Sequence, residues 1–264
     1  MNASLTHLHI LITRPKHQAA NISQQLKAAG AMVSCLPVIE IAPPADEFQI
    51  CNSLQQIDNY DNVIFVSSNA VKWAFKLGGT FLQKHITNCR IGAIGNKTAA
   101  ALSEYGIATS DMPAAGFNSE EFLALASMQA QELLCQRILI IRGEGGRELL
   151  ARTLMQRGAK VDYAEVYRRV CPPISSAYEM LQRQVQSPLD IIALTSCEGL
   201  HNLVQLLQKP HWLWTTPLLV GSERIAREAR ALGFQAELVI AADPSDRSMQ
   251  DALSGWRQGN INDR

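Results

Sequence analysis

A segment near the start of this chain recurs 128 positions further along. The letters ILITRP, beginning at Ile10, return as ILIIRG, beginning at Ile138. The same offset separates three further pairs, namely Arg14 and Arg142, Gly30 and Gly158, and Pro44 and Pro172. The run VIFVSSN from Val63 is echoed by IIALTSC from Ile191, again 128 positions away. A duplication of this length predicts two similar lobes, and ligand sites commonly form between such parts.

Length and composition agree with two ordinary domains. The 264 residues can bury two separate cores, and 47% hydrophobic with 18% charged residues is typical of soluble globular proteins. No apolar run approaches the ~20 residues of a membrane helix. The first residues lack the basic and apolar regions of a signal peptide, so we expect a cytoplasmic protein.

Charge and cysteine spacing exclude several classes of function. The 24 basic and 24 acidic residues balance, which gives no general attraction to nucleic acid or to an anionic membrane. The six cysteines are too far apart for a CxxC motif or a zinc knuckle. We interpret them as reduced, small hydrophobic residues and expect no bound metal.

Each copy alternates short apolar runs with helical patterns, which predicts βα units around a parallel sheet. The strand from Ile10 leads into a helix that starts at Pro15 and stops at Gly30. A second strand, Val63–Val66, precedes Ser67, a residue suited to cap the next helix. The prediction is an α/β protein with two similar flavodoxin-like or Rossmann-like lobes.

Two more features of the repeat bear on its architecture. A fourth βα element is expected near Asn118 and again near Pro244. Between the first βα unit and the rest of each copy lies a segment closed by prolines, Leu36–Pro44 and Ala164–Pro173. Proline removes an amide donor and disfavours helix before it, so both read as exposed strands or linkers that could pair as a two-stranded ribbon.

Small, hydroxyl-bearing or basic residues follow the predicted strands. In an open α/β sheet, ligands bind beyond the carboxyl ends of the strands, where helix N-termini favour anions. The same residue types also serve as ordinary helix caps, but six such turns together favour an anionic ligand. They are Thr13 with Arg14, Ser67 with Ser68, Gly95 with Thr98, Arg142 with Gly143, Thr195 with Ser196, and Gly221 to Arg224.

A glycine-rich loop and a tyrosine are two further candidates for the site. The glycine-rich run Arg142–Glu148 matches neither the P-loop nor the dinucleotide fingerprint. It is interpreted as a flexible loop that brings backbone amides and Arg142 close to a ligand, or else as a simple tight turn. Tyr167, in the second linker, could donate a proton to a leaving group in a cleft, or could be a half-buried strand residue.

The chain resembles the uroporphyrinogen-III synthase family. The matching segments run in order along nearly the whole sequence. They include LITRP, LPVIEIAP, YDNVIFVSSNAV, IGAIGNKTAAAL, RILIIRGEGGREL, YAEVYRR and LLVGSERIAREARALGF. Arg224 departs from the family pattern, which more often has threonine in that turn.

The resemblance implies two α/β lobes that are not the sequence halves, joined by a two-stranded β-ribbon hinge. One lobe would combine residues 1–36 with 173–264, and the other would span 45–163. The linker strands would be 37–44 and 164–172. Periodicity alone does not predict this exchange of elements.

The resemblance also implies a lyase that cyclises hydroxymethylbilane, a linear tetrapyrrole with eight carboxylates, to uroporphyrinogen III. Water is lost and ring D is inverted, in porphyrin and heme biosynthesis. Tyr167 matches the family tyrosine proposed to assist departure of the hydroxyl, and Thr98 matches the threonine of a GxxTA turn. We expect no cofactor, a monomer, and at most a transient contact with hydroxymethylbilane synthase.

Two other functions stay open from the residues alone. A non-catalytic two-lobed module could bind a tetrapyrrole or another polyanion without turnover. A two-lobed nucleotide-sugar transferase would be stabilised by a nucleotide, although the phosphate-binding fingerprints are missing.

Overall fold

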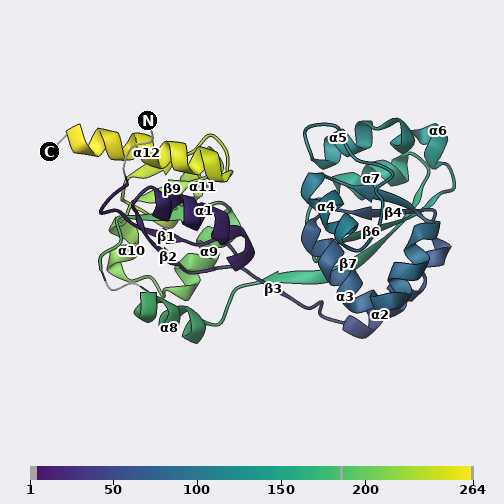
Figure 1. Ribbon diagram of the computed structural model, residues 1–264, viewed down its shortest axis with the longest axis horizontal. Coiled ribbons are helices and arrows are strands. Elements are labelled where there is room, and N and C mark those ends of the chain that lie inside the picture. The colour runs from purple at the N-terminus through teal and green to yellow at the C-terminus, as the bar shows by residue number, and fades with distance from the viewer. Residues whose placement is uncertain (1–4, 185–186, 263–264) are drawn as a thin grey trace. The chain divides into compact units, whose positions relative to one another are not determined.

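The computed structural model describes residues 5–184 and 187–262 and divides the chain into two compact units. Unit 1 comprises Met1–Glu40 and Val170–Arg264, and unit 2 comprises Ile41–Arg169. Each unit is built on its own five-stranded sheet (Figure 1). Within the described residues, no helix combines the length and apolar character needed to cross a membrane.

The sheet of unit 1 has the strand order β10-β9-β8-β1-β2, and all its pairings are parallel. Its strands are β1 (His9–Ile12), β2 (Met32–Cys35), β8 (Ile191–Leu194), β9 (Leu218–Val220) and β10 (Leu238–Ile240). Its helices are α1 (Lys16–Ala28), α8 (Ile174–Gln184), α9 (Cys197–Leu206), α10 (His211–Thr215), α11 (Glu223–Leu232) and α12 (Asp246–Asn262).

Alternating side chains of the unit 1 strands supply two cores, because successive residues of a strand point to opposite faces. Ile10 and Ile12 pack with α1 and α12 on one face. Leu11 packs with α8, α9 and α11 on the other face. The parallel sheet is therefore covered on both sides, as α/β folds require.

The sheet of unit 2 has the strand order β3-β7-β6-β4-β5. Its strands are β3 (Glu40–Ala42), β4 (Asn62–Phe65), β5 (Arg90–Ala93), β6 (Arg137–Gly143) and β7 (Lys160–Val170). Its helices are α2 (Glu47–Gln55), α3 (Ser68–His85), α4 (Asn96–Glu104), α5 (Ser119–Ala124), α6 (Ala130–Leu133) and α7 (Leu149–Gln156). Short 3₁₀ turns, η1 (Ile57–Asn59), η2 (Ile86–Asn88) and η3 (Ala126–Met128), complete it.

Unit 2 is also a three-layer arrangement. Val63 and Phe65 pack with α2, α3 and α4 on one face of the sheet. Ile64 packs with α5, α6 and α7 on the opposite face. The four strands that pair in parallel, β5-β4-β6-β7, follow the same order as their repeats β9-β8-β1-β2 in unit 1.

The prediction of two similar α/β lobes with parallel sheets is confirmed. The repeat is nevertheless shared between the units, because β1 and β2 of the first copy join a sheet with β8, β9 and β10 of the second. Gly30 and Gly158, the predicted helix stops, follow α1 and α7 with the same left-handed φ of 94°. Glycine adopts this conformation without the penalty that a side chain brings.

Two sequence expectations are wrong. The fourth βα element of the first copy has its helix, α5, but in place of a strand it has an isolated bridge between Gly92 and Asp111. The expected exposure of the first linker is wrong for its first part, because Leu36 and Val38 are each 1% accessible in the core of unit 1, whereas Glu40 and Pro43 are exposed. The apolar side chains of this first part gain from burial, and the following residues, Glu40–Ala42, form β3 beside β7.

Candidate active site

The carboxyl ends of the unit 2 strands bring four predicted residues to one edge of the sheet. Ser67 follows β4, Gly95 follows β5, and Gly143 ends β6. Tyr167 lies on β7 opposite Gly143. Because these strands are parallel neighbours, residues far apart in sequence meet at the edge where α/β folds bind ligands.

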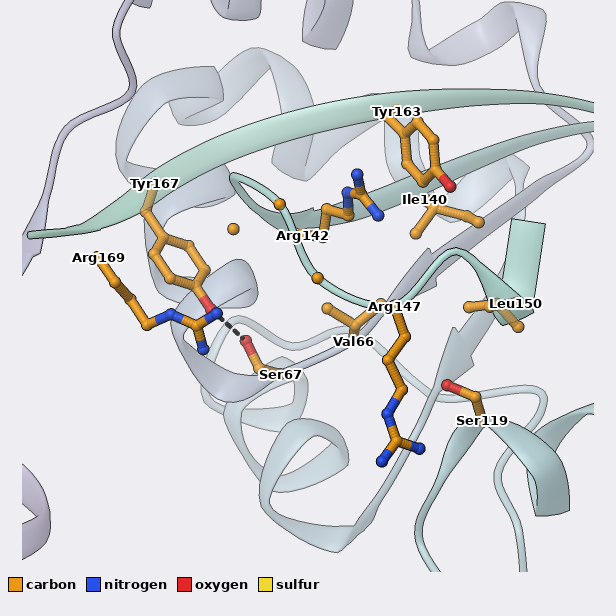
Figure 2. Close-up of a pocket in the computed structure, with 13 residues that line it drawn as sticks. Val66, Ser67, Ser119, Ile140, Arg142, Arg147, Leu150, Tyr163, Tyr167 and Arg169 are labelled. Carbon is orange, nitrogen blue, oxygen red and sulfur yellow. Dashed lines mark hydrogen bonds between the residues drawn. The ribbon is translucent and has the colours of Figure 1, made fainter. Parts of the chain in front are cut away.

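A cavity of about 270 Å³ lies at this edge, and Figure 2 shows the side chains around it. Val66, Ile140 and Leu150 form the apolar part of its lining. The polar lining residues are Ser67, Ser119, Arg142, Arg147, Tyr163, Tyr167 and Arg169, together with the backbone of Gly143, Gly145 and Gly146. An apolar pocket with a few converging polar groups is the usual form of a small-molecule site.

Tyr167 combines a buried ring with a hydroxyl directed into the pocket (Figure 2). The residue is 7% accessible, and its hydroxyl lies 3.3 Å from Oγ of Ser67. An irregularity in the pairing of β6 with β7 places Arg142 opposite Glu165 but Gly143 opposite Tyr167, which leaves Val166 as an extra residue. Such bulges re-aim side chains, and here the bulge turns Tyr167 toward Ser67.

Ser67 links the pocket to helix α3. Its Oγ accepts a hydrogen bond of 3.1 Å from the amide of Ala70, which confirms the predicted cap. Ser68 is the first residue of α3 and does not line the cavity. The hydroxyl of Ser67 therefore stands at a positive helix end and next to Tyr167, where it can help to bind an anionic group.

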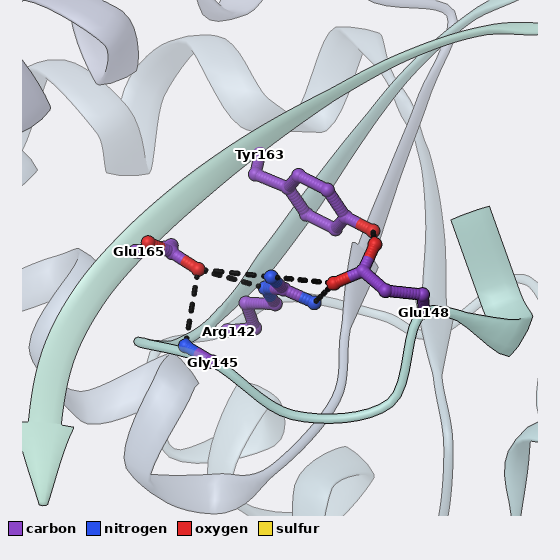
Figure 3. A network of polar contacts seen from close by, with 5 residues as sticks. All are labelled: Arg142, Gly145, Glu148, Tyr163 and Glu165. Carbon is purple, nitrogen blue, oxygen red and sulfur yellow. Dashed lines mark hydrogen bonds and ion pairs between the residues drawn. The ribbon is translucent and has the colours of Figure 1, made fainter. Parts of the chain in front are cut away.

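The glycine-rich loop is held by a network around Arg142 (Figure 3). Oε1 of Glu165 accepts from Nε and Nη2 of Arg142 at 3.1 and 2.9 Å, and from the amide of Gly145 at 3.2 Å. Oε1 of Glu148 accepts from Nη1 and Nη2 of Arg142 at 3.2 and 3.1 Å. The hydroxyl of Tyr163 donates to Oε2 of Glu148 at 2.7 Å, and the Arg142 guanidinium lies 3.8 Å from the Tyr163 ring centroid.

These contacts shift the ionisation of the groups involved. Burial and the hydrogen bond to Glu148 raise the pKa of Tyr163 to about 12. The hydrogen bonds of Tyr163 and Arg142 lower the pKa of Glu148. Burial alone would lower the pKa of Arg142, but the two glutamates outweigh it and the pKa is raised. At neutral pH Arg142 is therefore a cation, Glu148 a carboxylate and Tyr163 a neutral phenol.

Arg142 consequently makes different contacts from those expected of a carboxylate-binding arginine. Both sides of its guanidinium already face glutamates, and its side chain is 10% accessible. Its donors are largely used within the protein, so its role in the structure is to hold the loop. The pairing could not be anticipated from the loop itself, because Glu165 comes from β7.

The predicted residues of unit 1 lie together at the carboxyl edge of its own sheet. Thr13 is 3% accessible, and its hydroxyl donates to the carbonyl of Ala193 at 2.7 Å, which joins β1 to β8. Arg14 forms an ion pair with Asp246 at the start of α12. Thr195 follows β8, and Ser196 caps α9 by accepting from the amide of Gly199 at 3.0 Å.

The remaining pair, Gly95 and Thr98, lies in unit 2 but outside the cavity lining. Gly95 precedes α4, and a Cβ at this position would stand 3.0 Å from Cβ of Phe117. Thr98 is 5% accessible within α4.

Four polar lining side chains were not among the candidates predicted from the sequence. Arg147 lies in the glycine-rich loop and Ser119 begins α5. Tyr163 and Arg169 lie on β7, four and two residues from Tyr167. Spacing by two or four along a strand was the available signal, because such residues share one face. Among the described residues, no cluster of His, Cys, Asp or Glu is placed to hold a metal ion.

Comparison with known proteins places this chain in a family. The family profile described as uroporphyrinogen-III synthase HemD matches residues 20–251. The uroporphyrinogen-III synthase of Escherichia coli is 31% identical over 249 residues, which cover 93% of this chain and all of the relative. That of Salmonella typhimurium is 32% identical over 253 residues, with the same coverage.

Solved structures show the same fold at lower sequence identity. The uroporphyrinogen-III synthetase of Helicobacter pylori aligns with a TM-score of 0.64 at 16% identity, over 95% of this chain and all of the other. A mutant uroporphyrinogen III synthase of Thermus thermophilus aligns with a TM-score of 0.59 at 16% identity, over 97% of this chain and 99% of the other. The profile match and the relatives of similar length together show that the chain belongs to the uroporphyrinogen-III synthase family.

Proposed function

We propose that this protein cyclises hydroxymethylbilane to uroporphyrinogen III, with loss of water and inversion of ring D, in tetrapyrrole biosynthesis. Membership of the family supports the reaction. The observation that carries the assignment to a site is the Tyr167 hydroxyl, which lies 3.3 Å from Ser67 in a pocket rimmed by arginines. A phenol beside an anion-binding rim suits a substrate that carries both a leaving hydroxyl and carboxylates.

In the proposed reaction Tyr167 acts as a general acid. Its phenol gives a proton to the hydroxyl of the first ring while the carbon–oxygen bond breaks, so that water leaves and an electrophilic azafulvenium cation is formed beside the Tyr167 phenolate. The substituted carbon of ring D attacks this centre and gives a spiro intermediate. Rearrangement and ring closure then release a proton from the substrate, which can return to the Tyr167 phenolate.

Most of the catalytic effect is assigned to positioning. Hydroxymethylbilane closes unaided to the other isomer, so the protein has to hold the chain folded while the hydroxyl departs. The cavity of about 270 Å³ lies just below the ~300–1,000 Å³ of a site for a whole drug-sized ligand. We therefore propose that it receives one ring of the substrate with its acidic side chains.

The other predicted residues are proposed as further substrate contacts. Amides and hydroxyls at strand ends suit carboxylates, which a linear tetrapyrrole carries on every ring. These residues are Thr13, Arg14, Ser68, Gly95, Thr98, Thr195 and Ser196. Arg142 and Gly143 are assigned instead to the loop and to the packing of Tyr167, because their contacts are already made within unit 2.

We further propose a cytoplasmic monomer that works without a cofactor. The reaction is a redox-neutral dehydration, so it demands no electron carrier. All six cysteines are free, which fits a reducing compartment. A transient contact with hydroxymethylbilane synthase would shorten the time in which the unstable bilane closes spontaneously.

The test is to generate hydroxymethylbilane in situ, add the protein, oxidise the products and measure the ratio of type III to type I isomer. We expect a large excess of type III over the spontaneous background. A ratio no higher than the background rejects the enzymatic assignment. Tight binding of the bilane without turnover would favour the alternative of a non-catalytic binding module.

A further inference from the structure

Three consecutive residues of the glycine-rich loop are each joined to β7. The ring of Tyr167 covers Gly143, with Cζ 2.5 Å from where a Cβ would stand. The amide of Glu144 donates to the carbonyl of Tyr167 at 2.7 Å. The amide of Gly145 donates to the carboxylate of Glu165 at 3.2 Å. The position of the loop and the position of Tyr167 are therefore coupled through β7.

Glu165 is the side chain on which this coupling depends. One oxygen of its carboxylate accepts from Arg142 on β6 and from Gly145 in the loop (Figure 3). Gly145 and Gly146 have left-handed φ values of 72° and 107°, and a Cβ on either would meet nothing within 4 Å. Packing thus does little to fix this part of the loop, and the charged hydrogen bonds of Glu165 supply the restraint.

The charge of Glu165 is otherwise hard to explain in this place. A substrate with eight carboxylates is repelled by a glutamate beside its pocket, and Glu148 adds a second one next to the same Arg142. An acidic residue at an anion site is understandable when its bonds are made to the protein. The hydrogen bonds that Oε1 of Glu165 accepts from Arg142 and Gly145 are of this kind.

We propose that Glu165 is a positioning residue for the cyclisation. It fixes the glycine-rich loop and, through Glu144 and Gly143, the hydroxyl of Tyr167. This inference rests on the proposed function, because it assigns Glu165 a role in the proton transfer by Tyr167. It predicts that loss of the Glu165 carboxylate lowers kcat and leaves KM nearly unchanged.

The same two strands offer a matched control at their amino ends. Asp162 on β7 accepts from the hydroxyl of Tyr60 at 3.0 Å and lies 3.6 Å from Arg137 on β6. Arg137 also lies over the Tyr60 ring, 4.9 Å from its centroid. This arginine, carboxylate and tyrosine repeat the chemistry of the Glu165 network but lie outside the pocket lining. Asp162→Asn should therefore keep wild-type turnover.

The experiment compares Glu165→Gln, Glu165→Ala and Asp162→Asn in the full-length protein by kcat, KM and isomer ratio. We expect Glu165→Ala to lower kcat by about tenfold or more, since displacements of about 1 Å cost up to 100-fold. The kcat of Glu165→Gln should lie between those of wild type and Glu165→Ala, because its amide oxygen can still accept a hydrogen bond. Equal kcat in all three variants and wild type would overturn the proposal.

A double variant separates positioning from direct contact with the substrate. If Glu165 acts through Arg142 and the loop, Glu165→Ala should lower kcat by a smaller factor in the Arg142→Met background than in wild type, because only the bond to Gly145 is left to lose. An equal loss in both backgrounds would mean that Glu165 does not act through the Arg142 network, and positioning through that network would be rejected.

Hydrogen exchange of the loop amides distinguishes failure of this inference from failure of the proposed function. Glu165→Ala should speed exchange at Glu144 and Gly145, whereas Asp162→Asn should not. Unchanged exchange overturns the loop restraint even if the protein makes uroporphyrinogen III. If exchange is faster in Glu165→Ala but the wild-type protein makes no type III isomer, the loop restraint is retained and the role of Glu165 in catalysis is rejected.

Discussion

The ring of Tyr167 lies over Gly143 so closely that a Cβ at position 143 would stand 2.5 Å from Cζ and 2.9 Å from the hydroxyl oxygen of the tyrosine. Gly143 does not have the positive φ that reserves a position for glycine. The absence of a side chain matters here because it gives room to Tyr167. The distance between the hydroxyl and Ser67 therefore depends on a residue that carries no functional group of its own.

Gly143→Ala should displace the Tyr167 ring and reduce formation of the type III isomer. Overpacking of this kind costs about 1–3 kcal/mol of unfolding free energy, measurable by urea denaturation. Gly255→Ala in α12 is the control, because a Cβ there meets nothing within 4 Å and alanine in a helix is favoured by ~0.5–1 kcal/mol. Wild-type stability and turnover in Gly143→Ala would refute the close packing.

Tyr167→Phe keeps the ring over Gly143 and removes the proposed acid. We predict a fall in kcat of about 100-fold or more, the range for loss of general acid catalysis, with little change in unfolding free energy. Tyr105→Phe serves as control, because its ring stacks on Phe75 at 4.2 Å and lies outside the pocket lining. Unchanged turnover in the coupled assay would remove Tyr167 from the mechanism.

The two copies of the repeat allow a matched test of helix capping. Ser67 accepts from the amide of Ala70 at 3.1 Å, and Ser196 accepts from that of Gly199 at 3.0 Å. Each serine-to-alanine substitution should cost about 0.5–2 kcal/mol of unfolding free energy. Ser67→Ala also loses the contact with Tyr167, so it should cost at least as much as Ser196→Ala. If urea denaturation shows a larger loss of unfolding free energy for Ser196→Ala than for Ser67→Ala, this prediction is wrong.

Elements that depend on local pattern could be predicted from the sequence. The strands around Ile10 and Val63 and the cap at Ser67 follow from apolar runs and from the preference of serine for helix starts. The parallel sheets then place the strand-end residues at one edge. This reasoning pointed to the carboxyl edge of each sheet, and at that edge of unit 2 Ser67, Gly143 and Tyr167 line the cavity.

The contacts that tune the site could not be predicted in this way. Arg14 and Arg142 occupy the same place in the repeat, yet Arg14 pairs with Asp246, whereas Arg142 pairs with Glu148 and Glu165. Asp246 and Glu165 are distant in sequence from these arginines and meet them only through tertiary packing, which periodicity does not encode. The extra residue at Val166, which turns Tyr167, also cannot be predicted from the alternation of apolar and polar side chains in the sequence.

The pKa of Tyr163 gives a prediction for alkaline pH. Burial and Glu148 raise it to about 12, above the ordinary tyrosine value of about 10. Because the folded-state pKa is the higher one, the stabilising contribution of the neutral phenol is complete below pH ~10 and is lost as the pH rises through about 12. Ultraviolet titration of phenolate absorbance should show a component near this pH in the folded protein.

Tyr163→Phe should remove that component from the titration. Tyr60 also has a raised pKa, through burial and Asp162, so Tyr60→Phe is the control that should leave the Tyr163 component in place. If Tyr163→Phe instead removes a tyrosine that titrates near pH ~10, then burial and Glu148 do not raise the pKa of Tyr163.

Arg14 should contribute to the stability of unit 1 through its ion pair. It bonds to Asp246 and, at 2.6 Å, to the carbonyl of Pro244, and this joins the end of β1 to the start of α12. The side chains of Arg14 and Asp246 are 9% and 24% accessible, so the pair is only partly screened by water. Arg14→Met should therefore lower the unfolding free energy by about 2 kcal/mol, the cost of losing hydrogen bonds to a charged group.

Arg247→Met on α12 is the matched control for Arg14→Met. Arg247 lies 3.8 Å from Asp251, and its side chain is 93% accessible, so loss of this pair should change the unfolding free energy by less than about 0.5 kcal/mol. Asp246→Asn should also destabilise less in the Arg14→Met background than alone, because the two substitutions remove the same contact. Additive losses in urea denaturation would show that Arg14 and Asp246 stabilise unit 1 independently, and that the ion pair does not join β1 to α12.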